Sequence, residues 1–330
     1  MNKKLFYLLL VSFFLMAPLY AQEEETVPIN TEPETEQEYE QSLSQEEFEE
    51  NTQITPHEAH EEPKKYNTSF IEPFGNKFSL CLSTYISSLD FEQTYNDKTK
   101  ESYESNRPLE VGLGFLYGNF GLEFCQQTSF LYDSDYPKTK SQELRLNYYA
   151  RGATFEIQVK DYKGFHTGSK EETDLRLLFS GISGQYIWNN EEYSWRAAFG
   201  LYERQLRSAG SFLLGGTAFY MTSKKQLPEP YKKKYILAAP SLGYAYTWVY
   251  KSNLFFALSL SLGPGMAHEL CDTKYYLAVS HSFHGAAGYH WGDVSFMMSC
   301  QAFVLDIDLD SNKGDSFTSI LLQCSVAKRF

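Results

Sequence analysis

Three features are scarce in this chain of 330 residues, and each scarcity excludes a class of protein. The five cysteines stand singly, with no Cys-X-X-Cys pair, so their spacing suits no metal site. Outside the N-terminal region around Leu5–Leu15, no apolar run approaches the roughly 20 residues that a membrane-spanning helix needs. Residues 22–63 contain fifteen glutamates and neither lysine nor arginine. These absences argue against a helical membrane protein and a cysteine-based metal protein.

The negative charge is confined to one segment. The formal net charge is −13, but the glutamates of 22–63 account for it, and residues 64–330 sum to zero. Nothing therefore points to nucleic acid as a partner. Segment 22–66 has too few large apolar residues to offset the entropy of ordering, which predicts a disordered acidic tail. We expect this tail to lie in the periplasm, where it is a candidate for binding a periplasmic partner.

The N-terminus has the organisation of a secretory signal. Lys3 and Lys4 precede the apolar run Leu5–Leu15, and Ala21 is a small residue at a cleavage point before Gln22. Residues 1–21 are therefore predicted to be removed on secretion, with a retained anchor helix as the alternative.

Aromatic residues are abundant although the chain is polar on average. Tyrosine and phenylalanine each occur 25 times, yet the mean hydropathy is −0.41. Strands that face lipid on one side and a polar lumen on the other give this combination. The apolar and polar side chains of each strand average to a neutral hydropathy, while girdles at the two membrane interfaces add tyrosine and phenylalanine. A soluble β-sandwich also alternates. The secretory signal and the final aromatic residue favour a barrel in the outer membrane of a Gram-negative bacterium.

The last strand supports this prediction. Ile320, Leu322, Val326 and Phe330 share one face, because side chains alternate with a period of two. An alternating strand that stops on an aromatic residue is typical of outer-membrane barrels. We expect Phe330 to act as an assembly signal for the barrel-assembly machinery, and outer-membrane lipid to surround the outer face.

Strand patterns recur through the predicted barrel domain, residues 67–330. They are expected at 77–90, 107–117, 119–130, 143–150, 152–160, 173–187, 192–202, 209–222, 234–249, 252–266, 273–289, 293–307 and 316–330. Thirteen strands conflict with the even number in such barrels, and the alternation of short and long connections places the error between 192 and 222. One interrupted or bulged strand there leaves twelve. Pro240 and Gly243 predict a bulge or local break in 234–249.

The predicted fold class is therefore all-β, a transmembrane antiparallel up-and-down β-barrel of about 12 strands, with ten or fourteen as alternatives.

Several segments resemble a bacterial family of outer-membrane barrels known only as the domain of unknown function numbered four-four-two-one. The residues that carry the resemblance are Arg107–Leu109, Gly112–Phe115, Asn119–Leu122, Glu143–Leu146, Tyr162–Phe165, Arg196–Phe199, Ser208–Gly216 and Gly243–Val249. The resemblance covers roughly residues 75–330 and excludes the acidic tail. It implies location and architecture, and no catalytic residue.

Seven charged residues are expected to face the lumen from successive strands. They are Glu143, Arg145, Glu156, Lys160, Asp174, Arg176 and Arg196. Such a set could line a pore for small solutes, because fixed charges select what passes. It could equally pair across strands and fill the lumen, and the near balance of acids and bases favours this second outcome.

A second candidate is a segment that could bend into the lumen. Arg204 and Arg207 precede a glycine-rich strand that contains Gly210, Gly215 and Gly216. The alternative is a bulge that merely closes the barrel.

No catalytic, cofactor or metal site is assigned. Ser282 and His284 share a strand face, but no neighbouring carboxylate is present to orient the imidazole for a lipid esterase at the rim. The leading function is a narrow channel or solute-translocating barrel. The alternative is a non-transport envelope anchor or scaffold that binds partners through its acidic tail or loops, and the esterase is least favoured.

Overall fold

The computed structural model describes residues 66–75, 78–94, 99–128, 130–167, 173–225, 231–271, 274–310 and 313–330. The predicted signal peptide, and the predicted acidic tail apart from Tyr66, lie outside the described residues.

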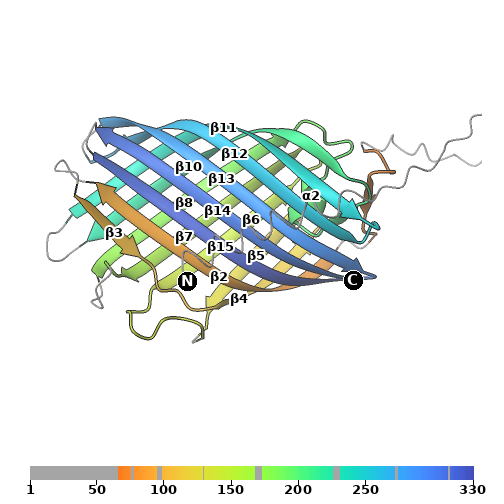
Figure 1. Cartoon of the computed structure of the whole chain (residues 1–330), viewed down its shortest axis with the longest axis horizontal. Coiled ribbons are helices and arrows are strands. Elements are labelled where there is room, and N and C mark those ends of the chain that lie inside the picture. Colours follow the sequence, from red (N-terminus) through yellow and green to blue (C-terminus); the bar gives the residue numbers. More distant parts are fainter. Residues whose placement is uncertain are drawn as a thin grey trace, which may run out of the picture. The chain divides into compact units, whose positions relative to one another are not determined.

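Twelve antiparallel strands form the wall of a closed barrel (Figure 1). In chain order they are β2 (Phe78–Thr94), β4 (Glu110–Tyr117), β5 (Phe120–Gln127), β6 (Lys140–Tyr149), β7 (Ala153–Phe165), β8 (Thr173–Ile187), β10 (Ala209–Lys225), β11 (Tyr231–Tyr250), β12 (Leu254–Glu269), β13 (Lys274–Trp291), β14 (Val294–Asp310) and β15 (Lys313–Arg329). Each pairs with the next, and β15 pairs with β2 to close the cylinder. A short strand, β3 (Lys100–Glu104), pairs with the end of β2. The predicted fold class and strand number are confirmed.

The outward face of the wall is apolar. On β7, Phe155, Ile157 and Val159 are exposed, whereas the adjacent Thr154 is buried. This is the period of two expected for a strand with lipid on one side and a polar lumen on the other. Aromatic side chains also point outward where strands meet short turns: Tyr117, Phe120, Tyr186, Trp188, Tyr250, Tyr289, Trp291 and Phe330. Such a girdle belongs at a membrane interface, so the wall is built to span a bilayer.

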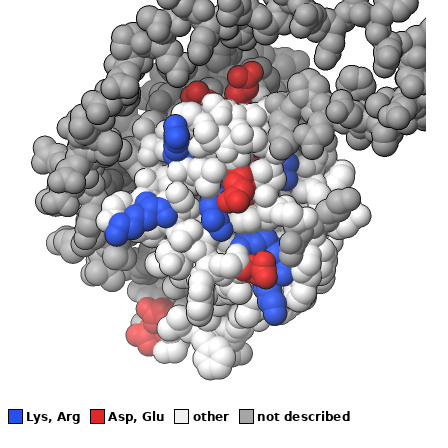
Figure 2. All heavy atoms as spheres, turned by 90° about the vertical axis from the view of Figure 1, so that its right-hand side faces the viewer, with Lys and Arg blue, Asp and Glu red and all other residues white. Residues whose placement is uncertain are grey.

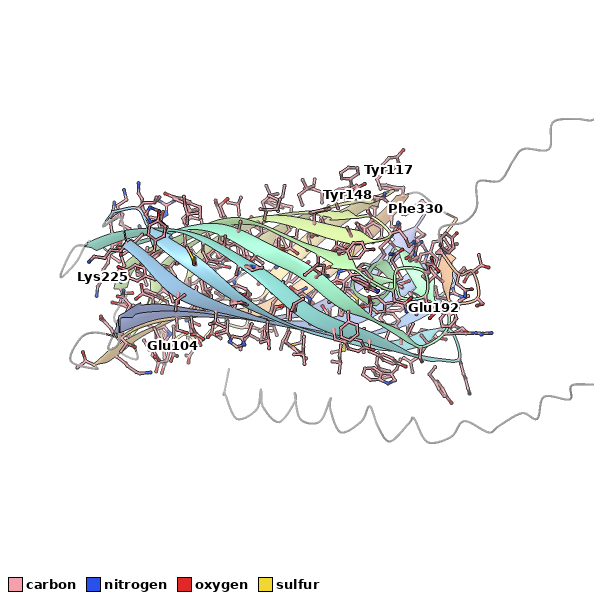
Figure 3. All side chains as sticks on the ribbon, turned by 90° about the horizontal axis from the view of Figure 1, so that it is seen from above. Glu104, Tyr117, Tyr148, Glu192, Lys225 and Phe330 are labelled. Atoms are coloured by element: carbon pink, nitrogen blue, oxygen red, sulfur yellow. The ribbon has the colours of Figure 1, made fainter. Side chains whose placement is uncertain are left out.

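The two ends of the barrel differ. The end with the aromatic girdle carries the short connections, and we call it the turn end; the opposite end is the loop end. Figure 3 shows Tyr117, Tyr148 and Phe330 at the turn end and Glu104 and Lys225 at the loop end. Tight reversals at the turn end use left-handed backbone, for example at Gly118, where φ is 57°. Glycine adopts this conformation without strain.

The segment between β8 and β10 does not join the wall. It contains α2 (Trp195–Phe199) and β9 (Glu203–Gln205), and β9 pairs with β1 (Ile71–Pro73) in a separate two-stranded sheet. The strand predicted at 192–202 is therefore wrong, and so is the idea of one bulged strand there. The count stays at twelve because this segment leaves the wall. Among the described residues, no helix has the length and apolar character needed to cross a membrane.

Two smaller expectations have opposite outcomes. The break predicted at Pro240 is confirmed on one side of β11, where pairing with β12 is missing between Ala238 and Leu242. On the other side pairing continues, with Gly216 of β10 opposite Pro240. The long gap between the strands predicted at 293–307 and 316–330 is wrong, because β14 extends to Asp310 and β15 begins at Lys313.

Candidate functional site

The lumen is layered along the barrel axis. Towards the loop end, inward side chains form an apolar layer, which we call the aromatic layer. It includes Leu89, Phe179, Phe219, Phe303 and Phe317. The ring centroids of Phe179 and Phe219 are 4.5 Å apart, and those of Phe219 and Phe303 are 5.7 Å apart. Packed rings from opposite parts of the wall therefore close this side of the lumen.

Residues 188–208, which we call the plug, fill the lumen towards the turn end. Trp195 and Ala198 of α2 are buried in a cluster with small inward side chains of the wall. These wall residues are Ala245, Ala257, Ala286 and Ala327. Alanine leaves the space that a larger inward side chain would occupy, so α2 fits inside the wall. The Ser194 hydroxyl caps α2 by accepting a hydrogen bond from the Ala197 N–H at 3.0 Å.

Glu203 is the polar centre of the plug. Its carboxylate is fully buried and accepts hydrogen bonds from both terminal nitrogens of Arg151, at 2.6 and 2.7 Å. Arg196 Nε lies 3.8 Å from the same carboxylate, and the Ser194 hydroxyl donates to it. Arg151 lies in the turn between β6 and β7, so this bidentate pair ties the plug to the wall.

Residues 66–75, which we call the strap, lie against the plug. Besides the pairing of β1 with β9, the Leu206 N–H donates to the Phe70 carbonyl at 2.7 Å. The Arg329 guanidinium, at the end of β15, lies 3.6 Å from the ring centroid of Phe74. The strap thus contacts both the plug and the wall. Figure 2 looks onto this end of the barrel and shows basic and acidic side chains interspersed on it.

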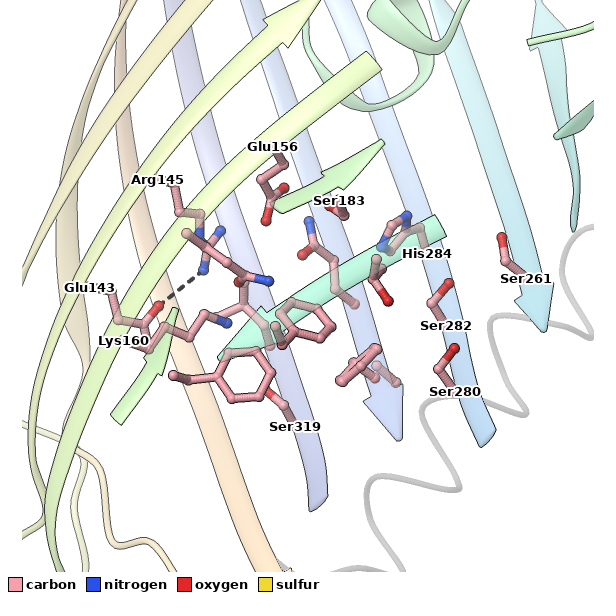
Figure 4. A pocket seen from close by; sticks show the side chains of 18 of the residues that line it. Glu143, Arg145, Glu156, Lys160, Ser183, Ser261, Ser280, Ser282, His284 and Ser319 are labelled. Carbon is pink, nitrogen blue, oxygen red and sulfur yellow. Dashed lines mark hydrogen bonds and ion pairs between the residues drawn. The ribbon is translucent and has the colours of Figure 1, made fainter. Parts of the chain in front are cut away.

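A cavity of about 200 Å³, which we call the chamber, lies between the aromatic layer and the plug (Figure 4). Its charged side comes from β6 and β7 and comprises Glu143, Arg145, Glu156 and Lys160. The neutral polar side chains drawn with them are Ser183, Ser261, Ser280, Ser282, His284 and Ser319. The chamber is therefore a polar space inside an otherwise packed lumen.

Glu143 is the centre of a buried ion cluster beside the chamber. Arg107 donates to it at 2.7 Å and the Tyr162 hydroxyl donates at 2.6 Å. Arg145 lies 3.3 Å from Glu143 and 3.9 Å from Glu123. Together with Glu110, the cluster contains three carboxylates and two guanidinium groups.

Sequence reasoning missed three charged members of this cluster, Arg107, Glu110 and Glu123. Arg107 also pairs with Glu110 at 2.5 Å, and both side chains are buried. Arg107 lies in the connection before β4, where strand periodicity carries no information. The only signal at this position was the family segment Arg107–Leu109.

Glu156 and Lys160 differ from the cluster. Both line the chamber from the inward face of β7. Within the described part of the chain, neither side chain makes a hydrogen bond or an ion pair shorter than 4.0 Å. They are thus one acid and one base that face the chamber without a hydrogen bond or a close ion pair, although Glu143 on the neighbouring strand attracts Lys160.

The remaining predicted lumen charges lie elsewhere. Asp174 and Arg176 alternate with the buried Leu175 and Leu177, so the prediction that they face the lumen is wrong. The Arg176 side chain is 57% exposed and pairs with Asp161 at 2.5 Å on the outer face. The end of β7 that carries Asp161 and the start of β8 that carries Arg176 both lie near the loop end, where the outer face carries charge. An alternating pattern divides the residues of a strand between two faces but does not say which face points into the lumen. In β8 the face that carries Asp174 and Arg176 points outward.

Three predicted arginines belong to the plug. Arg196 is on α2 and donates to the Asn119 side chain at 2.9 Å. Arg204 pairs with Glu72 of the strap at 3.4 Å, and Arg207 lies over the ring of Phe70. The plug therefore gathers these arginines at the turn end, away from the charged side of the chamber.

The glycines of the predicted inward-bending segment lie in the wall. Gly210, Gly215 and Gly216 are part of β10 and pair with β11. Only the part of the segment before Ala209 leaves the wall.

The serine and histidine candidates lie inside the lumen. Ser280, Ser282 and His284 share the inward face of β13 and line the chamber, so they are not at the rim. The His284 ring contacts Trp195 at a centroid distance of 5.5 Å, and no described carboxylate bonds to it. Within the described residues, no group of three or more metal-ligating side chains is assembled.

The closed wall, its apolar outer face and its layered lumen define a transmembrane β-barrel protein. The sequence profile of a domain of unknown function, DUF4421, matches residues 65–324, so the chain belongs to this family. A search of curated proteins found no match.

Solved structures that resemble the chain are outer-membrane proteins. OmpT of Vibrio cholerae is 7% identical, with a TM-score of 0.28 over 78% of this chain and 100% of that chain. The toluene transporter TodX of P. putida is 7% identical, with a TM-score of 0.29 over 77% of this chain and 90% of that chain. Likenesses this distant carry no argument about the function of this chain.

Proposed function

We propose that this protein is an outer-membrane barrel that passes a small polar solute through its lumen and is closed at rest by the plug. The chamber is the observation that supports this function most directly. A barrel that served only as an anchor would gain stability from an apolar, filled lumen. A polar cavity with unpaired charges instead destabilises the fold, at about 1–3 kcal/mol for each unsatisfied buried group.

The plug has the properties of a gate. It is not part of the wall, so its movement would leave the ladder of strand pairs intact. Its anchor to the wall is a polar contact between Glu203 and Arg151, which water can replace when the plug moves. Movement of the plug would open the chamber towards the turn end, which the proposed topology places in the periplasm.

The test removes most of the plug together with Ala209 and Gly210, the first two residues of β10, and leaves the rest of the wall in place. The Trp188 N–H bonds to the Phe212 carbonyl at 3.1 Å, so the flanking strands already lie side by side. Residues 190–210 are therefore replaced by an Asn-Gly turn, which suits a two-residue hairpin. The matched control is Glu191→Ala, an exposed position within the plug.

Single-channel recording in planar bilayers gives the readout. We expect the native protein and the control to be closed most of the time, and the plug-less protein to show steady conductance. Heat-modifiable mobility on a gel confirms that each protein is folded. A folded plug-less barrel that gives no conductance at any voltage or salt concentration would refute the proposal.

A non-transport role is the second candidate. The closure of the lumen by both the aromatic layer and the plug supports it, since a permanently closed barrel acts through its surface. In that case deletion of 22–63 would abolish capture of an envelope partner while leaving assembly intact. Loss of assembly on that deletion would count against this role.

A lipid esterase is the third candidate. Unchanged lipid turnover in a Ser282→Ala, His284→Ala double variant would exclude it.

A further inference from the structure

The unpaired charges of the chamber have a defined arrangement. Glu156 and Lys160 are four residues apart on the same face of β7, with Gln158 between them. Their Cα atoms are separated by about 13 Å along the strand, at about 3.3 Å per residue. Both side chains are long enough to lean towards each other across Gln158. They therefore present a carboxylate and an ammonium group to the same small volume.

The neighbouring charged side chains make no direct bond to Glu156 or Lys160. Glu143 is already bonded to Arg107 and Tyr162, and Arg145 is bonded to Glu143 and lies near Glu123. The cluster holds three carboxylates and two guanidinium groups, and its residual negative charge attracts Lys160, which lies opposite Glu143. Glu156 and Lys160 still have their hydrogen-bonding capacity free for an occupant of the chamber.

The other chamber residues labelled in Figure 4 are neutral, and Arg107 of the ion cluster also lines the cavity. Ser183, Ser261, Ser282 and Ser319 contribute hydroxyl groups, and Ser280 donates to the Gly263 carbonyl at 3.2 Å. Hydroxyl groups donate and accept hydrogen bonds, so they suit both ends of a dipolar solute. Phe179 and Phe317 bound the chamber towards the loop end, and Trp195 bounds it towards the plug. These large side chains limit the size of the occupant.

We propose, on the basis of the proposed function, that the chamber binds a small zwitterion of amino-acid size, with its ammonium group on Glu156 and its carboxylate on Lys160. An anion or a cation would leave one of the two protein charges without a hydrogen-bonded ionic partner, and a neutral polyol would leave both without one. Desolvated charges without partners are unfavourable, so the zwitterion is selected. The volume of about 200 Å³ suits this class, since it equals that of about six water molecules.

Four probes of nearly equal size separate the possibilities. L-alanine carries both charges, L-lactate lacks the ammonium group, alaninol lacks the carboxylate and 1,2-propanediol lacks both. Binding of each radiolabelled probe to the full-length protein folded in detergent is measured by equilibrium dialysis, both with the native plug and with the Asn-Gly replacement. We expect L-alanine to bind at least about tenfold more tightly than the other three.

Two variants test which protein side chain binds which charged group of the solute. Glu156→Gln is expected to remove the preference for L-alanine over L-lactate, and Lys160→Met is expected to remove the preference over alaninol. Asp161→Asn, on the outer face of the same strand, is the matched control and leaves both preferences unchanged. Heat-modifiable mobility again verifies folding.

The outcomes distinguish this inference from the proposed function. Equal binding of all four probes, or no binding even without the plug, overturns the inference. Conductance of the plug-less barrel together with equal binding leaves transport standing and removes the zwitterion. Selective binding of L-alanine with no conductance supports the site and removes transport.

Discussion

At the scale of single residues, Glu203 shows how one buried charge organises a segment. Its carboxylate is fully buried, yet it contacts Arg151 from the wall and Arg196 and Ser194 from the plug. A buried carboxylate is costly unless it is paired and hydrogen-bonded, so these partners are required together. The conformation of the plug therefore depends on a side chain that strand periodicity would not single out.

Replacing Glu203 by alanine is expected to loosen the plug without unfolding the barrel. The change leaves Arg151 and Arg196 near each other without a counterion, at a cost of about 3 kcal/mol. Trypsin should then cleave the folded protein within the plug, after Arg196, Arg204 or Arg207. Glu191→Ala, at an exposed site in the same segment, should stay resistant. Equal resistance of the two variants would show that Glu203 does not hold the plug.

At the scale of elements, the fit of α2 depends on the four strands around it. The helix has only five residues, which is too short to be stable alone, so its stability comes from packing. The inward alanines of β11, β12, β13 and β15 provide the surface on which it packs. Large side chains at those four positions would leave no space for α2 inside the wall.

Ala286→Leu is expected to displace α2. Ala286 is fully buried against the plug, and overpacking of such a site costs about 1–3 kcal/mol. Conductance in planar bilayers should rise towards that of the plug-less protein, while heat-modifiable mobility stays native. Ala287→Leu, the next residue and on the outer face of β13, is the matched control. A rise in conductance in both variants would point to a general disturbance of β13.

At the scale of the whole molecule, closure of the barrel depends on the pairing of the last strand with the first. The Ser83 and Ser325 hydroxyls lie 2.9 Å apart across this seam, and the Phe330 N–H donates to the Phe78 carbonyl at 3.0 Å. The ring centroids of Phe330 and Phe78 are 6.0 Å apart. Phe330 thus contributes to the seam as well as to the aromatic girdle, and its role as an assembly signal remains our proposal.

Phe330→Ser is expected to lower the fraction of folded barrel in membranes. The variant loses an aromatic pair, worth about 1 kcal/mol, and a lipid-facing ring at the seam. The heat-shifted fraction on a gel measures the effect. Trp188→Ser removes an equally outward aromatic residue away from the seam and should have the smaller effect. Similar loss in the two variants would assign the effect to the girdle alone.

Much of the wall was predictable because its pattern is local. The expected strands at 173–187 and 209–222 correspond closely to β8 and β10, and Glu143 and Arg145 face inward as expected. Prediction failed for Asp174 and Arg176, because periodicity defines two faces but the lumen side depends on the neighbouring strands. Arg107 and Glu110 were missed because they meet Glu143 only through tertiary structure.

The sequence by itself determined the alternating strands and the apolar outer face, because lipid on one side imposes a period of two on each strand separately. Only the tertiary structure decided that residues 188–208 fill the lumen, that the strap lies against them, and that Glu156 and Lys160 face a small chamber. These features depend on space left by alanines on four other strands and on charges paired across the barrel. Such contacts join residues far apart in the chain, and no local pattern records them.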